Sequence, residues 1–373
     1  TKKLPPGCIL KLDYKKEPKI KKYWNCEQKL YSKTKNIFKG TYEDAKEELL
    51  FRLNKSVSMR MNSDVPLGAF LSGGIDSTNI VLAMLSNNIV VNSFSLGFEN
   101  ANFDELPYAN NIAKHLNTNH NAINMSEKDC LSIIDNIGGY YDEPFSDPSQ
   151  IPTLLLCKYA RKKVTVALSG DGGDELFGGY PRYKNIAGRW RKNEYIPYWV
   201  KLIAKELTSL FSGNNNSFIE SFRKSMRKVS HRSFNELYLD EMSRWRPDEE
   251  IYYNKNISYE LCDLGKSYTD LSIERLLMLK DISTYLPGNL LVKMDRASMA
   301  FGLEVRSPFL DHDLAEFCWT LPDEYTVNNE KKDLLRSILI KKIPKKFIDR
   351  PKKGFEPPLA DWLNGPLSEW AGD

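Results

Sequence analysis

Two glycine-rich stretches of this sequence combine hydroxyl and carboxylate side chains at a spacing suited to phosphate chemistry. The first covers residues 70–78 and reads Phe-Leu-Ser-Gly-Gly-Ile-Asp-Ser-Thr. Its paired glycines, Gly73 and Gly74, allow a tight turn that brings backbone N–H groups close to an anion, and Ser72 and Ser77 add hydroxyl donors. The alternative is an ordinary glycine-rich turn between a strand and a helix, so this stretch by itself favours phosphate binding without establishing it.

The carboxylates in these stretches indicate a metal ion. Asp76 lies inside the first stretch and would repel phosphate unless a divalent cation lay between them, which implies Mg²⁺. The second stretch, residues 168–180, reads Leu-Ser-Gly-Asp-Gly-Gly-Asp-Glu-Leu-Phe-Gly-Gly-Tyr. It opens with another Ser-Gly pair, Ser169 and Gly170, and contains further acids. We expect Asp76 and Asp174 to hold one Mg²⁺ from two sides.

Apolar strands must position these two stretches. The runs at 67–71 and 164–168 read as buried strands directly before each stretch, and residues 78–85 read as the helix after the first one. A further buried strand is predicted at 90–98. Because parallel strands end at the same edge of a sheet, both glycine-rich loops would face one crevice. The pattern predicts an α/β fold with a parallel, twisted sheet flanked by helices.

The remaining sequence is mostly helical in pattern. Thr41 and Asp44 form a potential capping box, which predicts a helix that starts there. Residues 26–40 are polar and read as a linker. From about residue 183 to the end, apolar periodicity predicts an additional helical half. We therefore expect one domain over 41–373, with a helical part at about 183–373.

The two glycine-rich stretches together resemble the synthetase domain of glutamine-dependent asparagine synthetases, which has an ATP-pyrophosphatase (PP-loop) fold. Ser-Gly-Gly-x-Asp-Ser occurs in many ATP-pyrophosphatases, but the resemblance continues in order through nearly the whole chain. Further matching segments lie at 142–149, 293–300, 304–311 and 350–355.

The resemblance implies a carbon–nitrogen ligase. ATP, aspartate and ammonia would give asparagine, AMP and pyrophosphate through an aspartyl-adenylate, with ammonia delivered from glutamine by a glutaminase domain. Residues 1–40 match the end of that glutaminase domain and its linker. Family glutaminases use an N-terminal cysteine; Thr1 could itself act as a nucleophile, but nothing around it supports that role, and we interpret it as a cut end.

The resemblance also implies roles for individual residues. Phe70 and Leu96 match positions that contact adenine, largely through the main chain; the alternative, that both are core residues, is compatible with this. The implied ATP-binding set is Phe70, Ser72, Gly73, Gly74, Asp76, Ser77, Leu96, Ser169 and Gly170, and the implied metal ligands are Asp76 and Asp174.

Two residues are implied to be catalytic. Lys352 matches a lysine that stabilises charge on the α-phosphate; without the family match it would read as a surface lysine in a basic run. Asp171 matches a family acid, often Glu, and is a candidate general base or guide for the attacking nitrogen; the alternative is a supporting role beside the metal ligands. The chain departs from the family at Gly288 and Asn289, where an acid is common, so its contacts to the acid substrate are less secure.

Three functional hypotheses stay open on the sequence alone. The first is an asparagine synthetase. The second keeps the chemistry but changes the acceptor, as in uronate amidation or β-lactam and lasso-peptide cyclisation. The third is an inactive nucleotide-binding scaffold, against which the presence of Asp76, Asp171, Asp174 and Lys352 argues.

Composition narrows the class of protein and its partners. The 373-residue chain has a net charge of +4, no apolar run long enough to cross a bilayer and no signal-peptide core at its start. Six cysteines without a Cys-x-x-Cys pair indicate neither zinc nor a disulfide framework, so a reducing cytoplasm is expected. A homodimer is compatible with the family.

One segment is strongly basic. Residues 181–232 contain 12 Lys and Arg against 3 Asp and Glu. The functional reading is an anionic partner such as nucleic acid or a glycolipid. We favour a solvated helical face, because no nucleic-acid motif accompanies the charge.

Overall fold

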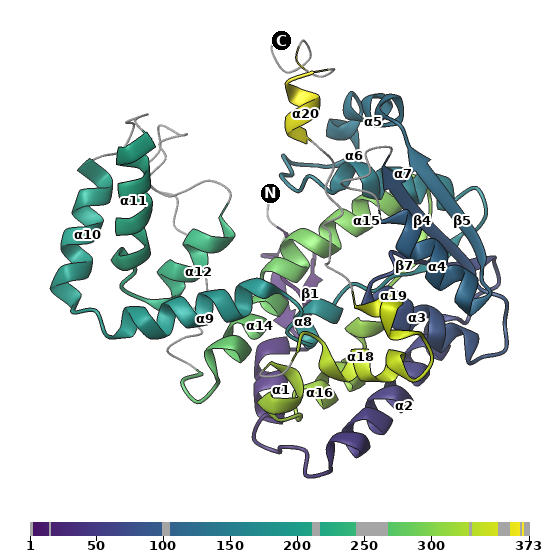
Figure 1. Ribbon diagram of the computed structural model, residues 1–373, viewed down its shortest axis with the longest axis horizontal. Helices are drawn as coiled ribbons and strands as arrows, with labels where there is room; N and C mark the ends of the chain where they lie inside the picture. The colour runs from purple at the N-terminus through teal and green to yellow at the C-terminus, as the bar shows by residue number, and fades with distance from the viewer. Residues whose placement is uncertain are drawn as a thin grey trace. The chain divides into compact units, whose positions relative to one another are not determined.

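The computed structural model describes residues 3–14, 16–98, 105–210, 217–243, 268–327, 330–349, 359–365 and 368. By its internal contacts the chain divides into two compact units. Unit 1 combines Thr1–Gly179 with Asp281–Asp373, and unit 2 is Tyr180–Lys280. Figure 1 labels most of the elements of both units.

A five-stranded parallel sheet forms the centre of unit 1. Its strands are β3 (Leu67–Phe70), β4 (Asn92–Phe98), β5 (Asn119–Met125), β6 (Val166–Leu168) and β7 (Glu304–Arg306), in the spatial order β5-β4-β3-β6-β7. The central strand β3 pairs in parallel with β4 on one side and β6 on the other. The loops after β3 and β6 therefore leave the same edge of the sheet side by side.

Helices cover both faces of this sheet. On one face α3 (Ile75–Leu85) and α4 (Leu106–Leu116) pack against the strands, and α2 (Tyr42–Arg60) and α18 (Asp333–Ile340) pack on α3. On the other face lie α7 (Gln150–Ala160), α5 (Glu127–Ile134) and α15 (Leu291–Met299), with α7 contacting both of the others. This arrangement is the α/β class that the sequence predicts, and it fits a PP-loop synthetase fold.

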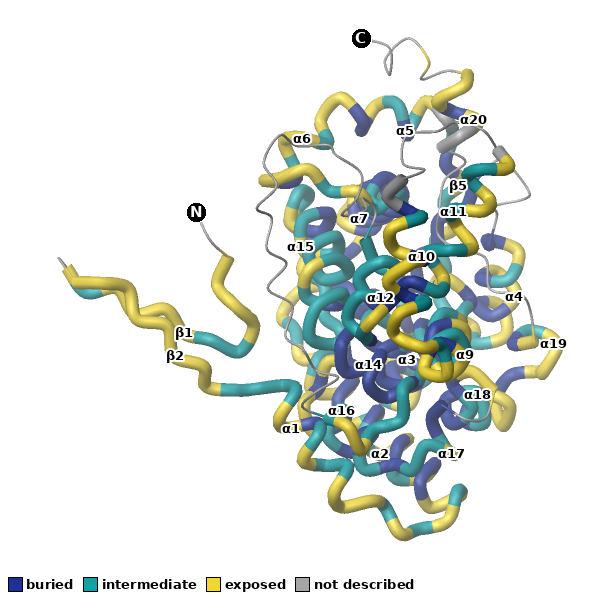
Figure 2. Tube along the Cα trace, turned by 90° about the vertical axis from the view of Figure 1, so that its left-hand side faces the viewer, coloured by how far each residue is buried: buried dark blue, intermediate teal, exposed yellow. Residues whose placement is uncertain are grey.

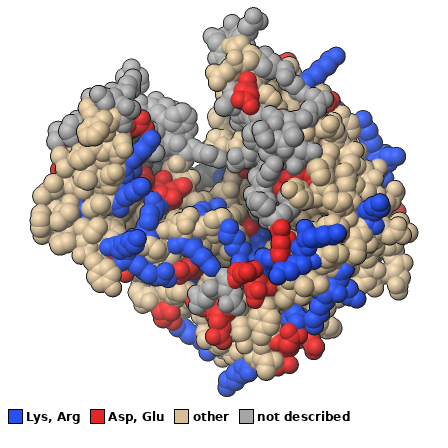
Figure 3. Space-filling view, in the orientation of Figure 1, with Lys and Arg blue, Asp and Glu red and all other residues tan. Residues whose placement is uncertain are grey.

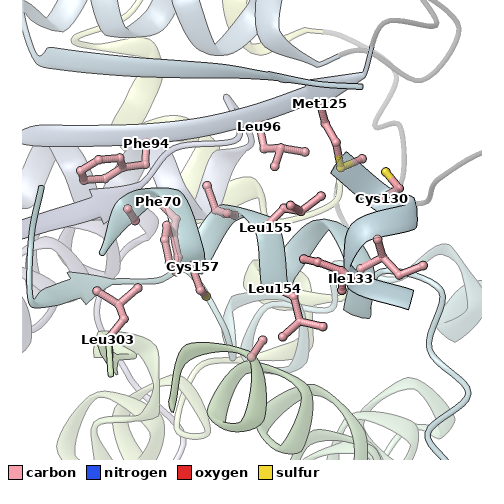
Figure 4. Packing of buried hydrophobic residues seen from close by; sticks show 14 of the residues in the cluster. Phe70, Phe94, Leu96, Met125, Cys130, Ile133, Leu154, Leu155, Cys157 and Leu303 are labelled. Carbon is pink, nitrogen blue, oxygen red and sulfur yellow. The ribbon is translucent and has the colours of Figure 1, made fainter. Parts of the chain in front are cut away.

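The second face encloses a continuous apolar core, which Figure 4 shows at close range. Phe70 and Leu96 from the sheet, Cys130 from α5 and Leu154 from α7 are all buried in it. Burial of apolar surface of this kind stabilises a fold by roughly 25 cal/mol per Å². The core thus fixes β3 and β4, and with them the start of the loop that follows β3.

Several expectations are confirmed at the level of elements. The predicted strands at 67–71, 90–98 and 164–168 are β3, β4 and β6. The capping box is present, since Thr41 Oγ1 accepts from the Asp44 N–H (3.3 Å) and the Asp44 carboxylate accepts from the Thr41 N–H (2.8 Å).

Other elements differ from the sequence-based expectation. Residues 26–40, predicted as a linker, begin with α1 (Cys26–Lys33), whose cap Asn25 accepts from the Gln28 N–H (3.4 Å) and whose Leu30 is buried. Strands β5 and β7 were not predicted. An antiparallel hairpin of β1 (Cys8–Lys11) and β2 (Lys19–Lys22) was also missed, and Figure 2 shows it exposed along most of its length.

Short elements complete unit 1. The π-helical turn η1 (Leu286–Leu290) leads into α15, and π-helical turns are frequent at functional sites. The others are α6 (Ile137–Tyr140), α8 (Gly173–Leu176), η2 (Pro308–Leu310), α16 (His312–Cys318), α17 (Asp323–Thr326), α19 (Lys345–Ile348) and α20 (Leu359–Leu363).

Unit 2 is helical. It contains α9 (Pro181–Glu194), α10 (Tyr198–Leu210), α11 (Ser217–Ser230), α12 (Phe234–Met242) and most of α14 (Ile273–Ser283). Six basic side chains of the 181–232 segment form ion pairs with acids of the same unit: Arg189, Arg191, Lys205, Lys224, Arg227 and Arg232.

Charges of both signs are interspersed on the face of the molecule that Figure 3 draws. Among the helices described, none combines the length and the apolar composition that a membrane span requires.

Candidate nucleotide and metal site

The first glycine-rich loop joins β3 to α3. Gly73 has φ +74°, the left-handed region that favours glycine, and a Cβ there would lie 3.0 Å from the backbone nitrogen of Ala109 in α4. The Ser72 N–H donates to Ser77 Oγ (3.2 Å), and the Gly74 N–H donates to Ser72 Oγ (3.3 Å). The hydroxyls of the loop thus gather at the N-terminus of the 11-residue helix α3, the end of a helix that favours anions.

The second loop joins β6 to α8 and lies directly against the first. A Cβ on Gly170 would lie 3.0 Å from Asp76 Cβ, and one on Gly173 would lie 2.7 Å from Asp76 Oδ1. Both glycines therefore allow the close approach of the two loops. The structure brings together the predicted residues of 72–77 and of 169–174.

Asp76 and Asp174 meet on one cation, the ammonium group of Lys332. Lys332 Nζ lies 2.6 Å from Asp174 Oδ1 and also donates to Asp76 Oδ2. The three side chains are nearly buried, with exposed fractions of 6% for Lys332, 16% for Asp76 and 15% for Asp174. Burial alone would lower the pKa of Lys332, but the two carboxylates outweigh it and raise that pKa above its ordinary value.

This pair of carboxylates suits magnesium held together with a nucleotide. Mg²⁺ is commonly bound by one or two carboxylates, with substrate phosphates and waters completing its octahedron. Within the described part of the chain there is no group of three or more His, Cys, Asp or Glu side chains that could form an all-protein metal site. The donor set therefore fits a metal that arrives with phosphate oxygens, with Asp76 and Asp174 as the side chains that would hold it.

The carboxylate of Asp171 interacts electrostatically with Asp76, Asp174 and Lys293. Its Oδ2 accepts from Ser169 Oγ (2.9 Å), which is 2.9 Å from Ser307 Oγ. Burial raises the pKa of Asp171, while the Ser169 hydrogen bond and the charge of Lys293 lower it; the net direction is upward. A carboxyl with a raised pKa is a stronger proton acceptor than a surface carboxylate.

A second polar cluster surrounds Asp147. Lys293 Nζ donates to Asp147 Oδ2 (3.1 Å) and to Ser149 Oγ (2.7 Å), and the Asn289 amide donates to the same Asp147 oxygen (3.3 Å). The asparagine that departs from the family pattern thus lies beside Lys293. Lys293 was not proposed as a site residue from the sequence, although its segment carries part of the resemblance.

The two residues implied to contact adenine are core residues in the structure. Phe70 ends β3 and Leu96 lies within β4, and both side chains are buried. Their side chains are labelled in the apolar cluster of Figure 4. A role in adenine binding stays a prediction that rests on their backbone. Lys352 lies outside the described residues.

Lys332 is the residue of this site that sequence reasoning missed. It is one of two consecutive lysines and directly precedes α18, with φ +54°. No local pattern marks it, because its partner Asp76 is 256 residues away along the chain.

Comparisons with known proteins identify the family. The family model for asparagine synthase matches residues 48–373. Asparagine synthetase [glutamine-hydrolyzing] 1 of Bacillus subtilis is 33% identical over 341 residues, which cover 84% of this chain and 50% of that protein. A putative asparagine synthetase [glutamine-hydrolyzing] 2 of Methanocaldococcus jannaschii is 35% identical over 290 residues, 75% of this chain and 53% of that protein. The chain spans about half the length of the curated relatives that it matches.

Proposed function

The chain belongs to the asparagine synthase family, and from this premise we propose that it is an ATP-dependent carbon–nitrogen ligase that converts aspartate to asparagine. The observation that carries the proposal is the meeting of Asp76 and Asp174 around one cation. The two carboxylates meet where the two glycine-rich loops leave neighbouring parallel strands. Ligands usually bind at this carboxyl-terminal edge of the strands in an open α/β sheet.

The first step activates the acid. A carboxylate cannot be amidated directly because oxide is too poor a leaving group. An oxygen of the aspartate side chain attacks the α-phosphorus of ATP, the bond from that phosphorus to pyrophosphate breaks, and an aspartyl-adenylate forms. Loop 72–77 would hold the phosphates through its N–H groups and hydroxyls. Mg²⁺, held by Asp76 and Asp174, would neutralise charge on the departing pyrophosphate, and Lys352 is proposed to act at the α-phosphate.

The second step forms the amide. Ammonia attacks the acyl carbon of the adenylate, the carbon–oxygen bond to AMP breaks, and the nitrogen loses a proton. Asp171 is our candidate for the acceptor of that proton, because its raised pKa suits a general base and Ser169 fixes its orientation.

The nitrogen source and the compartment are part of the proposal. The relatives' names include glutamine hydrolysis, so we propose that ammonia comes from glutamine through a glutaminase domain. The five cysteines that the structure describes form no disulfide among themselves, which suits a reducing cytoplasm.

The test is pyrophosphate release from Mg²⁺·ATP by this chain with ammonium present. Aspartate, glutamate and a hexuronate are supplied separately, and asparagine is identified among the products. Asp76→Asn should abolish release, whereas Asp135→Asn, the same change at an exposed residue at the end of α5, should leave it unchanged.

Each outcome assigns the chain differently. Aspartate-dependent release with formation of asparagine supports the proposal. Release with another acid keeps the two-step chemistry but overturns the substrate. ATP binding without release under any of these acids overturns the proposed reaction.

A further inference from the structure

Lys332 occupies the space between the two carboxylates that are proposed to hold a metal ion. Its ammonium group contacts one oxygen of Asp76 and one of Asp174. A Mg²⁺ ion bound by both carboxylates needs oxygens at about 2.0–2.1 Å, so the ion and the ammonium cannot share the space between them. A positive charge beside a bound divalent cation would also be strongly repelled in a site this buried.

The surroundings hold Lys332 in this place. The side chain is almost fully buried, and Gly179 lies against both Lys332 Cε and Asp174 Oδ1, where a Cβ would overlap them. Two nearly buried carboxylates that share one cation need that compensating charge, because an uncompensated buried charge is strongly destabilising. Lys332 meets that need through its contacts with both carboxylates.

The position of Lys332 in the chain also allows its ammonium group to move away from the two carboxylates. Lys332 directly precedes α18 in the left-handed backbone conformation, and its side-chain ammonium contacts the two aspartates. A lysine ammonium is a compact charge on a flexible stem of four carbons. A change of its side-chain rotamer would therefore separate the ammonium from the two carboxylates.

We propose that Lys332 is a built-in substitute for the metal: its ammonium neutralises Asp76 and Asp174 in the nucleotide-free protein and is displaced when Mg²⁺ binds with ATP. The inference rests on the nucleotide and metal site proposed above. It does not depend on the acid substrate or on turnover. One consequence is that the metal alone binds weakly, because it must compete with a tethered cation, whereas the metal with its nucleotide binds well.

The experiment measures Mn²⁺ binding to the nucleotide-free chain by electron paramagnetic resonance of the free ion. Lys332→Met removes the competing charge at nearly unchanged length and should tighten Mn²⁺ binding by at least about tenfold, which corresponds to ~1.4 kcal/mol. Lys331→Met makes the same change at the adjacent, exposed lysine and should leave the affinity unchanged. The double variant Lys332→Met/Asp174→Asn should lose the gain, because one of the two ligands is gone.

Protein stability gives a second readout. Without metal, Lys332→Met should unfold at a lower temperature than the unsubstituted chain, and Mg²⁺ should restore part of that loss while barely affecting the unsubstituted chain. Two outcomes would overturn the proposal that the Lys332 ammonium takes the place of the metal. One is that Lys332→Met binds Mn²⁺ no more tightly than the unsubstituted chain, and the other is that it fails to fold whether or not Mg²⁺ is present. Because no acid substrate is present, failure of the aspartate assay would leave this result intact.

Discussion

At the scale of single residues, Gly170 and Gly173 leave room for the side chain of Asp76. Gly173 has ordinary backbone angles, so alanine is conformationally acceptable there, but its Cβ would lie 2.7 Å from Asp76 Oδ1. We expect Gly173→Ala to displace this carboxylate and lower pyrophosphate release roughly 10- to 100-fold, as small misplacements of reacting groups do. Gly139→Ala is the matched control, since a Cβ there meets no atom within 4 Å. Unchanged release in Gly173→Ala would contradict the placement of Asp76 at the metal.

A second residue-scale prediction concerns the proton acceptor. Only the ionised form of Asp171 can accept a proton, and its pKa is raised, mainly by burial. Amide formation should therefore rise with pH through a midpoint above about 3.9, the ordinary value for Asp. The measurement is asparagine formed against pH at a fixed concentration of un-ionised ammonia.

Lys293 provides the control for that profile. Its positive charge lowers the pKa of Asp171, so Lys293→Met should move the midpoint to higher pH. Asp171→Asn should remove this limb and slow amide formation by about 10²- to 10⁴-fold, the usual contribution of a general base. A profile unaffected by both substitutions would exclude Asp171 as the base.

At the scale of elements, Asp311 ties a helix to the body of unit 1. Its Oδ1 accepts from the N–H groups of Asp313 (2.9 Å) and Leu314 (3.2 Å) at the start of α16, and its Oδ2 pairs with Arg60 of α2 (3.0 Å). Loss of such a cap costs about 0.5–2 kcal/mol, so we expect Asp311→Ala to lower the free energy of unfolding by that amount in urea at neutral pH. Asp313 is half-exposed and its carboxylate does not cap the helix, so Asp313→Ala should lower the free energy of unfolding by less.

The same cap predicts a pH dependence. Burial alone would raise the pKa of Asp311, but hydrogen bonds from Arg60 and the Leu314 N–H outweigh it and lower that pKa. The stabilisation is then fully present above the unfolded pKa of about 3.9 and is lost as pH falls through the lower, folded value. The difference in free energy of unfolding between Asp311→Ala and the unsubstituted chain should shrink toward zero as the pH falls below the folded pKa of Asp311. A difference that stayed constant would mean that the carboxylate charge is not what stabilises α16.

The elements that were predicted from the sequence carry a local sequence pattern, and those that were missed do not. Strands β3 and β6 are central and apolar, and their glycine-rich ends are local features, so both were predictable. β5 is an edge strand that reads Asn-His-Asn-Ala-Ile-Asn-Met, and β7 has three residues. Neither sequence carries a strand pattern of its own: β5 is ordered by its pairing with β4, and β7 by its pairing with the distant β6.

The site divides in the same way. The glycines, serines and aspartates of the two loops were predictable because each loop is a continuous motif. Lys332 and the link between Lys293 and Asp171 were not, because long-range packing alone brings them to the loops. Contacts between segments that are distant in the chain cannot be read from the pattern of a single sequence.

At the scale of the whole molecule, part of the positive charge of the basic segment 181–232 is compensated within unit 2. Six of its cations pair with acids of unit 2, which favours the reading as a solvated helical face. We expect a 20-base-pair DNA duplex to bind more weakly than about 100 μM at physiological salt, the weak end of non-specific binding. Fluorescence anisotropy measures this. A dissociation constant near 1 μM that weakens steeply with added salt would instead indicate an anionic partner.

The pairing of β6 with β7 has a consequence for the order in which the protein is made. Val166 pairs with Glu304, a separation of 304 − 166 = 138 residues, and unit 2 is synthesised between them. At about 5–20 residues per second, roughly 7 to 28 s pass on the ribosome between these two strands. During that interval β6 is an open edge, the kind of strand that pairs with other chains. Lys332 is synthesised later still, so the nascent chain carries Asp76 and Asp174 before the lysine that pairs with both of them.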